Sequence, residues 1–186
     1  MRQDLAGIAR AIIDANRYMT LATADREGRP WASPVFYAAA DYTEFYWISA
    51  PEATHSQNLA RRPQTSIVIF DSRAPEGAGQ AVYMSALAEQ VAARDLDRGL
   101  AVYPGPAERA GAPLAAEHVQ APAPYRLYRA TVSGHSVLCP RDTGPCALHG
   151  LAFDHRTPVR LGRVPWILAV ASGRPAGWLA RRRRSR

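Results

Sequence analysis

The chain lacks lysine altogether, and its 23 basic side chains are all arginine. Together with 15 prolines and abundant alanine, this bias is typical of a GC-rich genome and does not itself indicate a binding device. Acidic residues are absent from residues 161–186, where seven arginines equal the whole net charge of +7. The first 160 residues are therefore neutral, which argues against a basic nucleic-acid-binding surface on the body of the protein.

Long hydrophobic runs are missing as well, because no apolar stretch approaches the ~18–20 residues of a membrane span. The N-terminal segment carries acids and helical periodicity, unlike a secretory signal, and we expect a cytoplasmic location. No G-x-G-x-x-G follows a strand and no serine lies in a G-x-S-x-G elbow, so neither a Rossmann domain nor a serine hydrolase is indicated. A chain of 186 residues, 47% of them hydrophobic, fits one globular domain.

Cysteine is scarce: only Cys139 and Cys146 are present, with His149 and His155 close behind. A zinc site is conceivable from these residue types. Yet the C-x6-C-x2-H-x5-H spacing lacks the short pair of cysteines that structural zinc sites favour. We therefore expect two reduced thiols and no metal site.

The patterns that are present indicate a mainly β domain. Apolar residues within 3–16 recur at i, i+3, i+4 and i+7, which predicts an amphipathic helix. A short helix starting at Pro51 and ending at Arg61-Arg62, and another over 94–102, are also expected. β-Branched and aromatic residues, separated by turn residues, predict six strands over 18–23, 31–38, 42–49, 64–70, 80–91 and 125–138.

Short, mostly antiparallel strands with a few peripheral helices favour a small β-barrel with a helical lid. We assign residues 1–160 to this domain and residues 161–186 to a basic, partly disordered tail. Within the tail, the apolar run 166–170 could add an edge strand or cover a pocket. The terminal RRRRSR is most simply a solvated end, and nucleic-acid binding is not expected.

A cofactor site is indicated between residues 18 and 70. A Ser-Pro-Val-Phe segment lies beside the strand that runs into the polar helix start at 53–58. A helix N-terminus offers unpaired N–H groups and a positive dipole end, so it is a natural seat for a phosphate. Thr, Ser and Asn also cap helices without any ligand. A β surface for a flat ring beside a phosphate seat is typical of a nucleotide-type cofactor site.

Four segments carry a family resemblance: M-T-L-A-T, P-W-A-S-P-V-F-Y, F-Y-W-I-S followed by A-T-H-S-Q-N-L, and S-I-V-I-F-D-S leading to G-Q-A-V-Y-M-S. In this order and spacing, residues 18–89 resemble the pyridoxamine 5′-phosphate oxidase-like flavoproteins, the FMN-binding split-barrel superfamily. The resemblance implies a mainly β (α+β) fold, a six-stranded split barrel with peripheral helices. It further implies a homodimer with FMN at the subunit interface.

The resemblance also implies which residues hold the cofactor. The second strand would lie along the flavin ring, the end of the third strand near the ribityl chain, and the helix start at the phosphate. Gln80 would contact the ring edge or the ribityl group, in some members from the neighbouring subunit. The implied set is Ser33, Pro34, Val35, Phe36, Ile48, Ser49, Thr54, His55, Ser56, Asn58 and Gln80.

Two departures from the family pattern matter. His55 stands where many relatives have a lysine or arginine at the phosphate. A histidine with a pKa near ~6.5 is only partly charged at neutral pH, so we expect modest FMN affinity unless Arg61 or Arg62 helps. In addition, the C-terminal Trp and Arg pattern of the true pyridoxamine phosphate oxidases has no counterpart, so vitamin B6 oxidation is not expected.

We therefore expect a flavin (FMN)-dependent oxidoreductase that transfers a hydride through flavin N5 to or from a small substrate, with no catalytic side chain. Three alternatives stay open. The first is a deazaflavin-dependent reductase on the same fold. The second is a non-enzymatic flavin- or haem-binding stress protein, and the third is a nucleic-acid-associated protein acting through RRRRSR.

Overall fold

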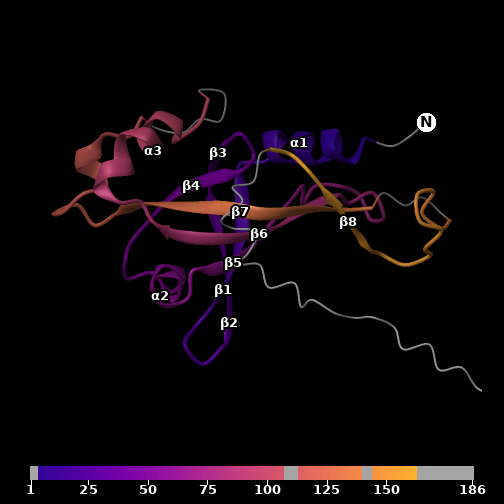
Figure 1. Ribbon diagram of the computed structural model, residues 1–186, viewed down its shortest axis with the longest axis horizontal. Helices are drawn as coiled ribbons and strands as arrows, with labels where there is room; N and C mark the ends of the chain where they lie inside the picture. The colour runs from indigo at the N-terminus through magenta and orange to yellow at the C-terminus, as the bar shows by residue number, and fades with distance from the viewer. Residues whose placement is uncertain (1–3, 107–112, 140–143, 163–186) are drawn as a thin grey trace, which may run out of the picture.

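The computed structural model describes residues 4–106, 113–139 and 144–162 (Figure 1). The predicted tail from residue 163 onward, with its apolar run at 166–170 and its terminal RRRRSR, lies outside the described residues. Among the residues that are described, no helix has the length and apolarity that crossing a bilayer requires.

The strands form one antiparallel sheet in the order β2-β1-β5-β6-β7-β4-β3, with β8 added along β7 (Figure 1). All six predicted strands are present, and the expected split-barrel α+β fold is confirmed. The strands are β1 Tyr18–Ala24, β2 Pro30–Phe36, β3 Ala38–Ala40, β4 Glu44–Ser49, β5 Gln64–Phe70, β6 Ala81–Gln90, β7 Arg126–Leu138 and β8 Arg156–Val159.

The sheet curls because its two ends are joined by one residue. β2 lies at one end of the strand order and β3 at the other, yet only Tyr37 separates them in the chain. The predicted strand over 31–38 is therefore two strands, with Tyr37 at the crossing. Its backbone N–H donates to the Arg17 carbonyl at 3.2 Å, and its ring is fully buried. Such a link holds the two ends of the sheet together as a barrel.

In the described part of the chain, three helices accompany the barrel: α1 Leu5–Ala15, α2 Thr54–Arg61 and α3 Leu96–Val102, the last preceded by the 3₁₀ turn η1 Ala93–Asp95. A further 3₁₀ turn, η3, spans Ala116–His118. In Figure 1, α1 and α3 lie above the sheet and α2 lies below it, beside β1 and β2. The α2 helix begins at Thr54 and not at Pro51, because Ala50–Ala53 form a hydrogen-bonded turn first (Ala53 N–H to Ala50 carbonyl, 3.1 Å).

The core explains why β4 is buried on both faces. Phe45 and Trp47 point into the barrel, where Trp47 stacks on Tyr128 with ring centres 5.6 Å apart. Tyr46 points the other way and packs with α3 and η3 residues in a second cluster. Because successive side chains of a strand face opposite sides, a strand between two apolar layers is apolar throughout.

Candidate functional site

A junction of three polar side chains lies where the barrel is split. Ser33 of β2 and Ser49 at the end of β4 stand on either side of His55, in the first turn of α2. The Ser49 hydroxyl lies 2.7 Å from His55 Nε2, and the Ser33 hydroxyl lies 3.1 Å from His55 Nδ1. Both ring nitrogens of His55 are therefore engaged, and the ring ties α2 to both strands.

A residue that the sequence reasoning missed supports this junction. Trp31 Nε1 donates to the Ser33 hydroxyl at 3.0 Å. The ladder of β2 is with β1, and β4 pairs with β3 and β7. Contact between β2 and β4 at this point is therefore made through side chains. The sequence signal for the Trp31–Ser33 contact was indirect: the two-residue period of a strand places both side chains on one face of β2.

Burial lowers the pKa of His55 below its ordinary value. A histidine in such a place is neutral at neutral pH, because the charged form loses its hydration. Without a ligand, His55 is thus a neutral hydrogen-bonding bridge. An anion bound beside it would have to raise the pKa of His55 before the ring became protonated.

The first turn of α2 is open at its N-terminal end. Ala53 stands at the N-cap position, and no side chain caps the helix there. The Thr54 side chain is exposed beside the backbone N–H groups of the first turn of α2. Arg61 and Arg62 belong to the other end of α2, about 10 Å away at 1.5 Å per residue. The α2 geometry therefore does not bring either arginine to the first turn.

The other two α2 candidates point into the protein. Asn58 is buried and donates to the Thr23 hydroxyl at 3.1 Å, so it fastens α2 to β1. Ser56 is 2% exposed, and its hydroxyl has no hydrogen-bond partner. It borders a cavity of about 320 Å³ beside Tyr128 and Ala88.

The second-strand candidates do not share a face. Ser33 and Val35 are buried, whereas Pro34 is exposed and Phe36 is half-buried on the outer face. Phe36 contacts Tyr18 and Tyr103 edge-on, with ring centres 5.8 and 6.1 Å apart. This alternation follows from the two-residue period of a strand.

Two further candidates complete the implied set. Ile48 is half-buried near the end of β4, next to Ser49. Gln80 directly precedes β6, about 25 Å along that strand from Ala88, whose N–H donates to the carbonyl of Pro63, just after α2. Within one chain, Gln80 and His55 are therefore not brought together. The Gln80 Oε1 atom is buried and has no hydrogen-bond partner.

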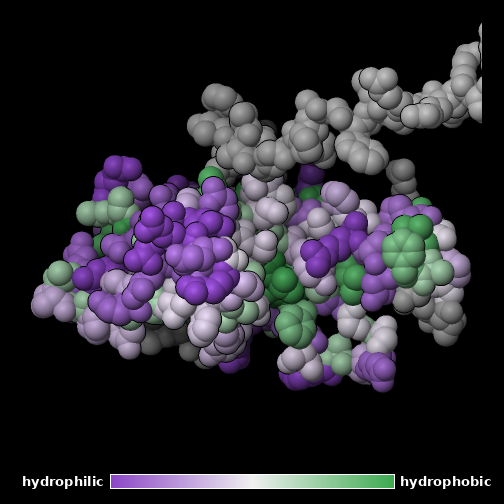
Figure 2. Space-filling model, turned by 90° about the horizontal axis from the view of Figure 1, so that it is seen from below, coloured by the Kyte–Doolittle hydropathy of each residue, from purple (hydrophilic) through white to green (hydrophobic). Residues whose placement is uncertain are grey.

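The outer face of β2-β1-β5-β6 carries one charged side chain among its outward strand positions, Glu89 near the end of β6, and Arg156 of β8 lies over the Tyr83 ring, 3.6 Å from its centre. The outward positions follow from strand register and burial: Pro30, Ala32, Pro34, Phe36, Tyr18, Thr20, Ala22, Ala24, Gln64, Ser66, Val68, Phe70, Ala81, Tyr83, Ser85, Leu87 and Glu89. Figure 2, a view from below, shows a hydrophilic region on the left and smaller apolar patches toward the middle and right.

Two hollows mark this outer face. One, of about 430 Å³, is bordered by Ala22, Arg62, Gln64 and Ser85, and the other, of about 380 Å³, by Val68, Tyr83 and Arg156 among others. Neither includes a residue of the implied cofactor set. These two hollows and the His55 junction are thus separate places on one subunit.

Comparison with known proteins places the fold. The profile of the family described as pyridoxamine 5′-phosphate oxidase matches residues 7–137. The sequence matches none of the curated proteins with which it was compared.

Solved structures agree on the fold. A haem binding protein from Mycobacterium smegmatis superposes with a TM-score of 0.61 at 23% identity, over 85% of this chain and 59% of that one. The haem storage protein HutZ from Vibrio cholerae superposes with a TM-score of 0.55 at 18% identity, over 72% of this chain and 94% of that one. A FAD-binding protein from Mesorhizobium loti superposes with a TM-score of 0.51 at 19% identity, over 69% of this chain and 87% of that one. This chain thus spans less than two thirds of the M. smegmatis protein, and identities this low establish shared fold alone.

Proposed function

We propose a flavin-binding function from one premise: this chain belongs to the pyridoxamine 5′-phosphate oxidase family, whose profile covers residues 7–137. The proposed cofactor is FMN, held between two copies of the chain. The proposed activity is hydride transfer to or from a small substrate. The cytoplasmic location, expected from the sequence, stays a prediction.

The observation that carries the proposal is the open first turn of α2, fixed at the split between β2 and β4 by the His55 bridge. Free backbone N–H groups and the exposed Thr54 hydroxyl are donors that fit a phosphate. No arginine stands in that turn, so the phosphate would be held chiefly by dipoles and neutral donors. We expect modest affinity for this reason.

The outer face of β2-β1-β5-β6 has few charged side chains, which supports a homodimer. Interfaces between like subunits are depleted of charge at their centres, and the strand positions in the middle of this face, around Ser66 and Ser85, are uncharged. Gln80 lies far from His55 in one chain, and a second copy could bring its own Gln80 near. The cofactor site would then need residues of both subunits.

When bound, flavin supplies the hydride chemistry at N5. The chain's own part is to orient the ring beside Ser33–Phe36, to fix the phosphate at Thr54 and to exclude water. No side chain is assigned a proton-transfer role, because the junction's one titratable group is neutral and already holds two hydroxyls.

The test is a titration of the purified chain with FMN and with riboflavin, followed by quenching of flavin fluorescence. We expect FMN to bind at least about 10-fold more tightly than riboflavin, a difference of about 1.4 kcal/mol contributed by the phosphate. Thr54→Ala should remove most of this preference. Arg61→Ala, at the far end of α2, is the matched control and should leave it within about 2-fold.

Absence of any FMN binding, or equal binding of both flavins, would refute the proposal. A deazaflavin cofactor titrated in the same way separates the reductase alternative, because tighter binding of that cofactor than of FMN would replace FMN in the proposal.

Haem binding is a second candidate, favoured by the two structural neighbours described as haem binding and haem storage proteins. Haemin titration followed in the Soret region tests it. Stoichiometric haemin binding that FMN cannot displace would favour this function over the flavin one.

A further inference from the structure

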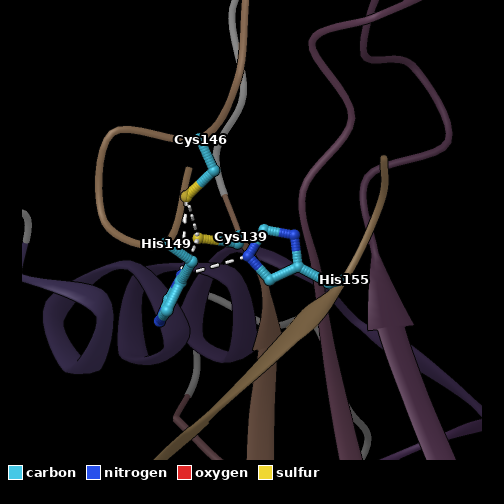
Figure 3. A group of neighbouring side chains, drawn as sticks. All are labelled: Cys139, Cys146, His149 and His155. Atoms are coloured by element: carbon cyan, nitrogen blue, oxygen red, sulfur yellow. Dashed lines mark hydrogen bonds between the residues drawn. The ribbon is translucent and has the colours of Figure 1, made fainter. Parts of the chain in front are cut away.

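Four metal-ligating side chains meet beyond the end of the sheet (Figure 3). They are Cys139, Cys146, His149 and His155, and one ligand atom from each lies within 4.8 Å of all the others. The two sulfurs are 3.0 Å apart, His149 Nδ1 lies 3.7 and 3.6 Å from them, and His155 Nε2 lies 3.1 Å from His149 Nδ1. Both cysteines are free and buried.

Strand pairing brings two of the four together. Cys139 directly follows β7, and His155 directly precedes β8. The β7-β8 ladder continues past Leu138 and Arg156, so the Cys139 N–H donates to the His155 carbonyl at 2.9 Å. The two side chains thus stand as neighbours across the strands.

A tight turn supplies the other two. The N–H groups of His149 and Gly150 donate to the Cys146 carbonyl at 3.3 and 2.7 Å. Gly150 has φ +66°, a left-handed conformation that favours glycine. The turn therefore presents Cys146 and His149 to the same point.

The orientation of His155 is that of a metal ligand. Its Nδ1 lies 3.0 Å from the Phe153 carbonyl, and only an N–H can donate there. Nε2 then carries a lone pair, and it faces the other three ligand atoms (Figure 3). A backbone carbonyl that fixes the far nitrogen of a histidine in this way is characteristic of metal sites.

We propose that Cys139, Cys146, His149 and His155 bind one Zn²⁺ ion in a tetrahedral site. Around zinc, with Zn–S of ~2.3 Å and Zn–N of ~2.0–2.1 Å, ligand atoms lie roughly 3.3–3.8 Å apart. Here the four distances given above run from 3.0 to 3.7 Å and no pair is more than 4.8 Å apart, so small side-chain movements would bring all four ligand atoms to those separations. Two thiolates and two imidazoles suit zinc and balance its charge. All four positions are filled by protein, which makes the site structural and not catalytic.

The site would anchor a part of the chain with little core of its own. β8 has four residues, and most side chains between 145 and 154 are exposed. Zinc would join the end of β7, the Cys146–Gly150 turn and the start of β8, in place of the apolar contacts that larger elements use.

The experiment uses the full chain, purified without a histidine tag, and measures metal by plasma mass spectrometry. We expect one zinc per chain. After removal of zinc, titration with Co²⁺ should give visible bands of a tetrahedral ion and a thiolate charge-transfer band, both abolished by Zn²⁺.

Variants locate the site. Cys146→Ser and His155→Ala should each weaken Zn²⁺ binding by more than about 100-fold. His118→Ala, an exposed histidine on η3, is the matched control and should keep one zinc. FMN binding, measured on the same samples, reports the proposed cofactor site separately.

Two results would overturn the proposal. One is a reduced wild-type chain that binds no stoichiometric Zn²⁺ and gives no thiolate band with Co²⁺. The other is a native Cys139–Cys146 disulfide that, once reduced, still binds no zinc. Because both are measured on the wild-type chain, variants that fail to fold do not affect the decision.

Discussion

Two histidines, the buried His135 and the half-buried His55, are neutral rings that serve as hydrogen-bonding parts of the fold. His55 joins Ser33 to Ser49, and His135, only 4% exposed, has Nε2 2.7 Å from the Tyr42 carbonyl, to which it donates. Burial lowers the pKa of both, and for His135 the Tyr42 carbonyl partly offsets that lowering. Neutral rings in these places make the folded state sensitive to acid.

The free energy of unfolding should fall as pH drops below about 7, because the unfolded histidines, with pKa values near ~6.5, take up protons before the folded ones do. The loss should continue until the pH reaches the lowered pKa of the folded state. Urea unfolding between about pH 5 and about pH 7.5 measures the slope. His135→Gln, which keeps a donor for Tyr42 but does not titrate, should flatten it.

His118→Gln, on the exposed η3 turn, is the control and should leave the slope unchanged. An identical slope in wild type and His135→Gln would contradict this account of His135.

Among the elements, α1 depends on one cap. The Asp4 carboxylate accepts from the Gly7 N–H at 2.9 Å and so satisfies one of the free donors of the first turn. Asp4→Ala should lower the free energy of unfolding by about 1 kcal/mol. Asp4→Asn keeps an acceptor and should lower the free energy of unfolding by only a few tenths of the loss in Asp4→Ala. Chemical denaturation compares the two variants. Equal losses would show that the cap is not the cause.

The α3 helix depends on a close approach to the sheet. A Cβ atom on Gly99 would lie 2.6 Å from Leu127 Cδ2 and 3.2 Å from Tyr46 Cε1. Gly99→Ala gains about 1 kcal/mol of helix propensity but overpacks a buried contact at a cost of about 1–3 kcal/mol. We expect a net loss of about 1 kcal/mol in thermal unfolding. Gly134→Ala, where a Cβ meets no atom within 4 Å, is the control.

The six predicted strands and three helices could be found from the sequence because each has its own apolar period. β3 could not, since three alanines carry no pattern, and neither could β8, which is four residues long with Pro158 in it. The exact start of α2 was missed because Pro51 suits a turn as well as a helix start.

The candidate site was predictable only in part. Ser33, Ser49 and His55 do meet, yet the inward direction of Ser56 and Asn58 depends on how α2 docks, which no local pattern encodes. The Cys139–His155 cluster was considered as a zinc site from the sequence and set aside for a similar reason. Its spacing along the chain is long, and the β7-β8 pairing makes it short in space.

For the whole molecule, the outer face of β2-β1-β5-β6, with uncharged strand positions at its middle, makes self-association testable. Ser66 and Ser85 are cross-strand partners near its middle. Ser66→Arg would place a charge where the proposed dimer excludes water, so the dimer should weaken by more than about 10-fold. Ser72→Arg, in the exposed loop after β5, adds the same charge elsewhere and is the matched control.

Analytical ultracentrifugation measures both variants beside the wild type, and FMN affinity should fall together with dimerisation. A wild type that sediments as a monomer at every concentration would contradict the dimer.

The single-residue crossing at Tyr37 limits where the protein can change in length. An insertion there would force β2 or β3 to present its opposite face or would spread the barrel open, since one residue spans both ends of the sheet. The exposed 71–79 loop carries no such constraint. Peptide tags or reporter domains are therefore best accommodated between β5 and β6, and relatives of different length should vary there and not at the crossing.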